Sequence, residues 1–271
     1  MKYFFFDIDG TLKPYGRDIP LSAKDTIKKL KECGNKVFLA TGRRKNEIEA
    51  IMDEMQIENA VCSGGACVIL DRKVEYEIYF SKKDLKEILT ECRKFNVIMV
   101  SVGEGMCYTA DKGLITMIYS FIMKIYSKSK RFRVGSVQGR GGSNYTKIES
   151  LSDEEFLEKP TQKLIFFNCR KINKVKCLQK HTIYNERLWR SIEFDFKEKG
   201  IDYVKNKFNI ELKDIVVFGD GRNDISMFKY SENAIAMGEA CSEVKKNASF
   251  VTKNSYDDGV EYACRHFGWI N

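Results

Sequence analysis

Acidic residues follow two strongly apolar stretches of the sequence, one near its start and one near residue 218. They are Asp7 and Asp9 in the first case and Asp220 and Asp224 in the second. Side chains alternate along an extended chain, so the first two carboxylates point to the same side, and Gly10 lets the chain turn away after them. Several carboxylate oxygens in one small volume suit Mg²⁺. The sequence therefore predicts an acidic, metal-binding centre.

Short apolar runs, typical of strands buried on both faces of a parallel sheet, precede these residues. Three such runs occur, at residues 3–6, 37–40 and 215–218, and the second ends in Thr41-Gly42-Arg43. Between the first two we expect a helix that is capped by Ser22 and ends at Gly34. This strand–helix–strand order predicts a Rossmann-like α/β core with a parallel sheet, in which ligands gather at the carboxyl ends of the strands.

The middle of the chain has a different pattern and is predicted to be a second α/β unit inserted into the first. Its expected helices and strands cover residues 83–95, 97–102, 106–109, 114–126 and 164–168. We therefore predict a catalytic core formed by residues 1–81 and 187–271, with residues 82–186 as a cap domain. Both sizes are ordinary for domains.

Positive charge is concentrated in the predicted cap. Residues 82–186 hold 20 Lys and Arg against 11 Asp and Glu, and residues 112–147 hold eight basic residues and no acidic one. An anionic partner should therefore meet the cap. Steering of a charged small molecule is one interpretation, and a nucleic-acid surface formed with the neighbouring aromatic residues is an alternative.

Several classes of protein are excluded by composition. No stretch approaches the roughly 18 to 20 apolar residues of a membrane helix, and the first acidic residue comes too early for a signal peptide, so we expect a cytoplasmic protein. The nine cysteines form no C-x-x-C pair and the chain has two histidines, which argues against a zinc site or chemistry that needs a histidine cluster.

Taken together, these motifs resemble those of the haloacid dehalogenase superfamily of phosphatases, and within it the Cof-type hydrolases. The resemblance covers the whole chain and depends on FDIDGTL at residues 6–12, ATGR at 40–43, KG at 199–200 and GDGRNDISM at 219–227. The family has a Rossmann-like core with an inserted α/β cap, as predicted above. One departure is GGA at residues 64–66, where the family usually has NGA.

The resemblance implies a role for each matching residue. Asp7 is the expected nucleophile and Asp9 the expected general acid and base, with Thr41 and Lys199 as further catalytic residues. The residues expected to hold Mg²⁺ are Asp7, Asp9 through its backbone carbonyl, Asp220 and, in support, Asp224. Those expected to bind phosphate are Asp7, Gly10, Thr41, Gly42, Lys199 and Asn223.

The predicted function is Mg²⁺-dependent hydrolysis of a small phosphorylated metabolite, a sugar phosphate by resemblance, through an aspartyl phosphate. In the cap, the residues expected to contact the leaving group are Arg131, Arg133, Arg140 and Lys147. The alternatives are a phosphomutase or other phosphoryl-transfer enzyme of the same fold, or a phosphate- or nucleic-acid-binding regulator that uses the basic cap. The sequence indicates neither which phosphate ester is the substrate nor the oligomeric state.

Overall fold

The computed structural model describes residues 1–103, 106–111, 148–185 and 189–271. These residues divide into two compact units, one made of Met1–Glu77 and Asp195–Asn271 and the other of the described residues between Ile78 and Phe194. The sequence instead predicts the divisions at 81/82 and 186/187. The rings of Phe80 and Phe194 stack with centroids 4.7 Å apart, which places both connecting segments in the second unit.

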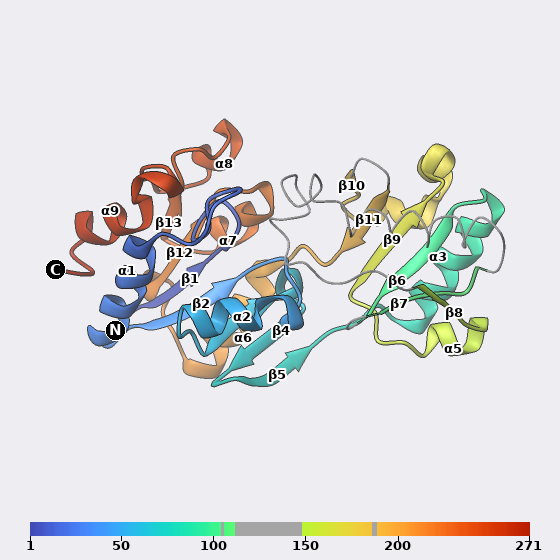
Figure 1. Ribbon diagram of the computed structural model, residues 1–271, viewed down its shortest axis with the longest axis horizontal. Helices are drawn as coiled ribbons and strands as arrows, with labels where there is room; N and C mark the ends of the chain where they lie inside the picture. Colours follow the sequence, from blue (N-terminus) through green and yellow to red (C-terminus); the bar gives the residue numbers. More distant parts are fainter. Residues whose placement is uncertain (104–105, 112–147, 186–188) are drawn as a thin grey trace. The chain divides into compact units, whose positions relative to one another are not determined.

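The first unit contains a sheet of eight strands, drawn in Figure 1. Their order is β14 (Phe250–Val251), β13 (Asn233–Ala236), β12 (Ile215–Gly219), β1 (Tyr3–Phe6), β2 (Lys36–Ala40), β3 (Asn59–Cys62), β4 (Cys67–Leu70) and β5 (Lys73–Glu77). The first six strands are parallel, and β3, β4 and β5 pair antiparallel. The three apolar runs that the sequence singles out are β1, β2 and β12, which are neighbours in this sheet.

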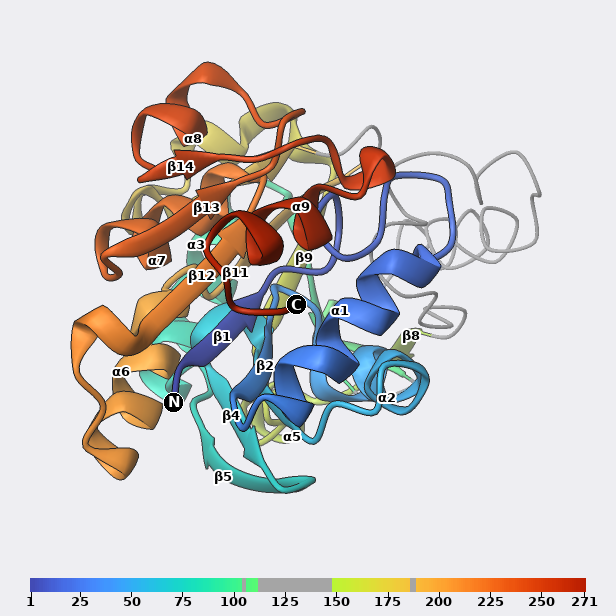
Figure 2. The ribbon, with the colours of Figure 1, turned by 90° about the vertical axis from the view of Figure 1, so that its left-hand side faces the viewer.

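Helices cover both faces of this sheet. They are α1 (Leu21–Glu32), α2 (Lys45–Glu54), α6 (Lys197–Phe208), α7 (Ile225–Lys229), α8 (Ser242–Lys246) and α9 (Gly259–His266). Figure 2 shows α1 and α2 on one side of the strands and α6 and α7 on the other.

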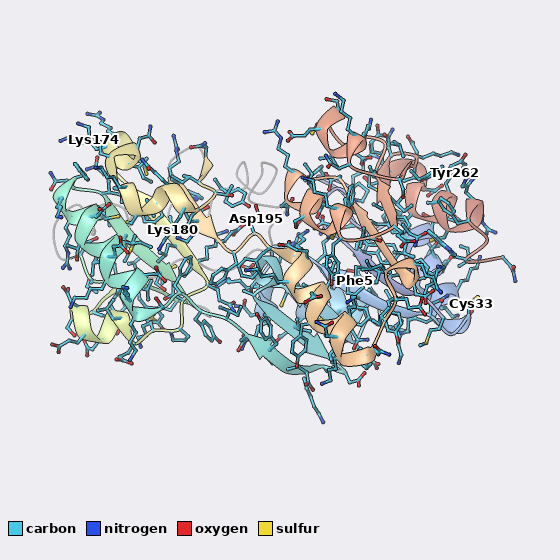
Figure 3. The ribbon with its side chains drawn as sticks, turned by 180° about the vertical axis from the view of Figure 1, so that it is seen from behind. Phe5, Cys33, Lys174, Lys180, Asp195 and Tyr262 are labelled. Atoms are coloured by element: carbon cyan, nitrogen blue, oxygen red, sulfur yellow. The ribbon has the colours of Figure 1, made fainter. Side chains whose placement is uncertain are left out.

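Side chains of β1 alternate between two apolar clusters, as the period of a strand requires. Phe4 and Phe6 pack with α1, α2 and α9, whereas Tyr3 and Phe5 pack with α6, α7 and α8. Figure 3 labels Phe5 within this unit. Each fully buried phenylalanine contributes about 1.5–3 kcal/mol. Burial on both faces fixes β1 at the centre of the unit, and with it the position of the residues that follow.

The second unit has a sheet of its own in the order β10 (Tyr184–Asn185), β11 (Arg190–Glu193), β9 (Lys163–Phe167), β6 (Ile98–Val102), β7 (Cys107–Thr109) and β8 (Ile148–Ser150). Its pairs are antiparallel except for β7 with β8. The described helices of this unit are α3 (Lys82–Lys94) and α5 (Asp153–Leu157), with short 3-10 turns at η3 (Cys169–Lys174) and η4 (Lys176–Lys180).

The predicted α/β fold class is confirmed, with one local correction. Helix α1 begins at Leu21 after Pro20, so Ser22 does not cap it, and the Ser22 hydroxyl donates to Asp258 instead. Gly34 does follow the helix end, in a left-handed conformation with φ of 78°. The helix expected at residues 114–126 lies outside the described residues. No helix in the described ranges is long and apolar enough to cross a membrane.

Candidate active site

The carboxyl ends of three neighbouring strands bring the predicted residues together. Asp7 follows β1, Thr41 follows β2, and Asp220 follows β12. The Asp7 amide donates to the carbonyl of Phe218 at 2.9 Å, which continues the β1–β12 ladder by one residue into the site. Strands paired in parallel register end at the same edge of the sheet, so three sequence-distant turns share one volume.

Three carboxylates form the centre of this site. Oxygen atoms of Asp7, Asp220 and Asp224 all lie within 4.8 Å of one another, and Asp7 and Asp224 are buried. Asp224 also shapes the turn, since its Oδ2 accepts the backbone amides of Asp220 at 3.0 Å and Gly221 at 2.9 Å. The residue thus fixes the loop that carries Asp220.

Lys197, and not Lys199, is the lysine of this site. Its Nζ donates to Oδ1 of Asp7 at 2.6 Å and to Oδ1 of Asp224 at 2.5 Å, and its side chain is completely buried. The sequence analysis places Lys199 in the catalytic and phosphate-binding set, whereas the structure brings Lys197 into contact with these carboxylates. The Lys199 side chain is exposed, and its ammonium lies 4.4 Å from the centre of the Phe196 ring, beside an open surface pocket with Tyr76 and Tyr203.

Helical periodicity explains why Lys197 faces inward. Lys197, Gly200, Ile201 and Val204 are the buried residues of α6 and recur at the spacing of one helix face. Lys199 falls on another face. This spacing is the signal in the sequence that identifies the lysine.

Close contact with the turn after β3 fixes the start of α6. The Phe196 amide donates to the carbonyl of Gly64 at 2.9 Å. A side chain on Gly65 would come within 2.3 Å of the Phe196 carbonyl oxygen, and Gly65 has a φ of 98°, so only glycine fits there. Gly64, which stands where the family usually has asparagine, and the neighbouring Gly65 thus lie against the segment that leads into Lys197.

Asp9 forms an ion pair with Arg43, a residue for which the sequence predicts no role. Arg43 Nε and Nη2 donate to the two oxygens of Asp9 at 2.9 and 2.6 Å, in the planar two-bond geometry that holds a carboxylate in one orientation. The Arg43 amide also donates to the Thr41 hydroxyl oxygen at 3.1 Å. Thr41 is buried and keeps its own hydroxyl hydrogen to donate.

The remaining predicted residues fall into two groups. Gly10, Gly42 and Asn223 lie in the turns after β1, β2 and β12, and Gly10 packs directly beneath the carboxylate of Asp220. The expected cap contacts Arg131, Arg133, Arg140 and Lys147 lie outside the described residues.

Electrostatics of the buried cluster favour a divalent cation. When all three carboxylates are ionised, the single ammonium of Lys197 leaves two negative charges uncompensated. Burial raises the pKa of Asp7 well above its ordinary value, and the nearby Asp224 and Asp220 raise it further, while Lys197 opposes this. Burial also lowers the pKa of Lys197, but attraction to Asp224 and Asp7 outweighs that effect and raises it overall. The donor set and its excess charge of −2 therefore fit Mg²⁺.

Binding of Mg²⁺ should stabilise the protein more at pH 8 than at pH 6. Burial and the neighbouring Asp224 raise the pKa of Asp220 from 3.8 to about 7 in the metal-free protein. Between pH 3.8 and about 7, Asp220 holds a proton in the folded state but not in the unfolded state. The contribution of Asp220 to the free energy of unfolding therefore falls as the pH rises through this range. The cation must displace that proton at pH 6 but not at pH 8. Thermal unfolding with and without Mg²⁺ measures the difference, and equal Mg²⁺-induced rises in Tm at both pH values would contradict it.

Comparisons with known proteins agree with this geometry. Residues 4–264 match the family model for haloacid dehalogenase-like hydrolases. The chain is 27% identical to YkrA of Bacillus subtilis (strain 168), a protein provisionally named a phosphatase. The alignment covers 99% of this chain and 98% of YkrA. It is 25% identical to 5-amino-6-(5-phospho-D-ribitylamino)uracil phosphatase YwtE of the same organism, over 97% and 96%.

The chain also resembles a solved structure of a phosphatase from this superfamily. The sugar phosphatase BT4131, described as a member of subclass IIB of the haloacid dehalogenase superfamily, matches with a TM-score of 0.72 and 27% identity over 100% of both chains. The family and the hydrolase assignment predicted from the sequence are confirmed. The chain belongs to the haloacid dehalogenase-like hydrolase family.

Proposed function

We propose that this hydrolase is a Mg²⁺-dependent phosphatase that cleaves a small phosphorylated metabolite through an aspartyl phosphate on Asp7. The observation that carries the proposal is the cluster of Asp7, Asp220 and Asp224, in which the buried Lys197 ammonium donates to Asp7 and Asp224 and the half-buried Asp220 lies beside them. Such a cluster combines a nucleophilic carboxylate with positive charge and with ligands for a cation.

Asp7 is the proposed nucleophile. Attack of its Oδ on phosphorus forms the acyl phosphate and breaks the bond between phosphorus and the ester oxygen. A carboxylate that approaches a phosphate dianion at about 4 Å meets a repulsion of about 8 kcal/mol at an effective dielectric constant near 20. Lys197 offsets part of this repulsion because its ammonium lies 2.6 Å from Asp7. Mg²⁺, held by Asp7, Asp220 and the backbone carbonyl of Asp9, would supply two further positive charges.

Asp9 is the proposed general acid and base. It gives a proton to the leaving oxygen and then takes one from the water that hydrolyses the acyl phosphate. Arg43 holds the Asp9 carboxylate through two hydrogen bonds, so the group is oriented before the substrate arrives. To act as the acid, Asp9 must be protonated on one oxygen, and that oxygen must first leave its Arg43 donor. The proposed role of the buried Thr41 hydroxyl is to donate to an oxygen of the transferred phosphoryl group.

Sugar phosphates are the proposed substrate class. Support comes from the family resemblance, from the sugar phosphatase BT4131, and from YwtE, whose named substrate carries a phosphorylated ribityl chain. The basic residues of the second unit suit an anionic substrate of this size.

A series of phosphate esters with graded leaving groups tests the proposal. Wild-type protein should hydrolyse them with Mg²⁺ and lose the activity with a chelator. Asp9→Asn should slow turnover by about 10²–10⁴-fold for poor leaving groups and by much less for a nitrophenolate, because a stable anion leaves without a proton. The measurement is kcat/KM for each ester with both proteins.

Glu49→Gln, on the surface of α2, serves as the matched control and should follow the wild type. A rate of hydrolysis that is unchanged by the chelator would contradict the proposed Mg²⁺ dependence. An Asp9→Asn defect that is the same for every leaving group would remove the general-acid role.

A further inference from the structure

The loop after Asp9 is folded so that it presents one aromatic side chain to the acidic cluster. The Gly10 amide donates to the carbonyl of Lys13 at 2.8 Å, and the Lys13 amide donates to Ile8 at 2.7 Å. A tight turn follows, closed by the Arg17 amide on the Pro14 carbonyl at 3.1 Å.

Tyr15 and Gly16 occupy the two central positions of that turn. Gly16 has a φ of 71°, as the third residue of a type II turn requires, and glycine meets that requirement without strain. Arg17 anchors the far side of the turn, with its guanidinium 5.4 Å from the centre of the Tyr256 ring. Tyr15 is therefore held at the tip of a short, ordered loop.

The hydroxyl of Tyr15 contacts the carboxylate of Asp220. It donates to Oδ2 at 3.0 Å, while the Thr11 hydroxyl approaches Oδ1 of the same carboxylate at 3.4 Å. A Cβ on Gly10 would come within 2.2 Å of Asp220 Oδ2, so the carboxylate of Asp220 packs directly against the backbone of this loop. One loop thus holds both oxygens of Asp220.

Packing does not explain this placement of Tyr15. The side chain is 63% exposed, so the ring contributes little apolar burial. An exposed aromatic ring whose hydroxyl reaches a partly buried carboxylate is positioned by that polar contact.

We propose that Tyr15 is a positioning residue that holds Asp220 in the orientation in which it binds the divalent cation. The inference rests on the proposed function, because it assigns Asp220 as a metal ligand. Asp220 lies beside two other carboxylates that repel it, and a free side chain would relieve the repulsion by rotating toward solvent. The Tyr15 hydroxyl opposes this rotation, and removal of such a supporting contact typically weakens metal binding by about 10–100-fold.

Calorimetric titration of the metal-free protein with Mg²⁺ alone tests the inference. Tyr15→Phe keeps the ring and removes only the hydroxyl, so we expect its Kd for Mg²⁺ to rise about tenfold. The Tm of the metal-free variant should equal that of the wild type, since the ring is exposed. The Mg²⁺ concentration that gives half the maximal phosphatase rate should rise by the same factor as Kd.

Two further variants make the outcome specific. Tyr262→Phe removes the hydroxyl of another partly exposed tyrosine on α9 (Figure 3) and should bind Mg²⁺ as the wild type does. Asp220→Asn should lose binding at this site. A Kd for Tyr15→Phe within twofold of the wild type overturns the inference, and so does a fall in metal-free Tm that accompanies weaker binding. If the wild type itself binds no Mg²⁺, the metal in the proposed function fails, which is a distinct result.

Discussion

Asparagine in place of Asp7 should lower kcat by about 10⁴-fold or more, because an amide cannot attack phosphorus and form the acyl phosphate. The change is nearly isosteric, so the β1 end and its contact with β12 should persist. The activity is measured with excess Mg²⁺, so that weaker metal binding does not limit the rate. Wild-type turnover by Asp7→Asn would show that the nucleophile lies elsewhere.

Loss of activity in Asp7→Asn should come without loss of stability. Asp7 belongs to a buried group with excess negative charge, and its raised pKa shows that the charged form is disfavoured there. Neutralising it leaves Lys197 paired with Asp224 at 2.5 Å. Thermal unfolding of the metal-free protein should therefore give a Tm at or above that of the wild type. Asp25→Asn, on the exposed face of α1, is the control for the substitution itself.

Lys197→Met and Lys199→Met should behave very differently, although the two residues are separated by a single position. Without Lys197 the attack by Asp7 loses its nearest positive charge, so kcat should fall by about 10²–10³-fold. The buried carboxylates also lose their partner, which should cost about 3–5 kcal/mol of unfolding free energy. Lys199 contacts the Phe196 ring at the surface, so Lys199→Met should change activity less than about threefold and stability by less than about 1 kcal/mol.

Assays of this pair should be run well below the Tm of the weaker variant, with the folded fraction checked by circular dichroism. The kcat values then compare folded proteins. Comparable losses of activity in both variants, or a larger loss in Lys199→Met, would mean that the buried lysine is not the catalytic cation.

Much of the core could be predicted because its strands are buried on both faces. Four consecutive apolar residues at 3–6 are typical of such a strand, and they form β1 as expected. The aspartates and the threonine at the strand ends follow from that placement. Asp7, Thr41 and Asp220 therefore come together as predicted, since the parallel pairing of β1, β2 and β12 determines their neighbourhood.

The sequence analysis assigns the site lysine to Lys199, although a pattern in the chain indicates Lys197, which contacts Asp7 and Asp224 in the structure. Lys197 and Lys199 stand in the same charged run, and a short motif ending in Gly200 does not distinguish them. The apolar positions Ile201 and Val204 do, because the face they define includes Lys197 and excludes Lys199.

Contacts between loops could not be predicted from the sequence. The pairing of Arg43 with Asp9 and of Tyr15 with Asp220 joins residues 34 and 205 positions apart. Each contact depends on how two irregular turns pack, and no periodicity of the chain encodes that arrangement. In the proposed mechanism these contacts orient Asp9, the acid–base group, and Asp220, a ligand of the metal.

The most direct test of the account is to trap the covalent intermediate on Asp7. Protein quenched during turnover with a phosphate ester and Mg²⁺ is treated with borohydride, which reduces an aspartyl phosphate to homoserine, and its peptides are sequenced by mass spectrometry. If Asp7 is the nucleophile, homoserine appears at position 7, depends on the substrate and is absent from the Asp7→Asn variant. Active turnover that leaves Asp7 unmodified, or homoserine at another aspartate, would contradict it.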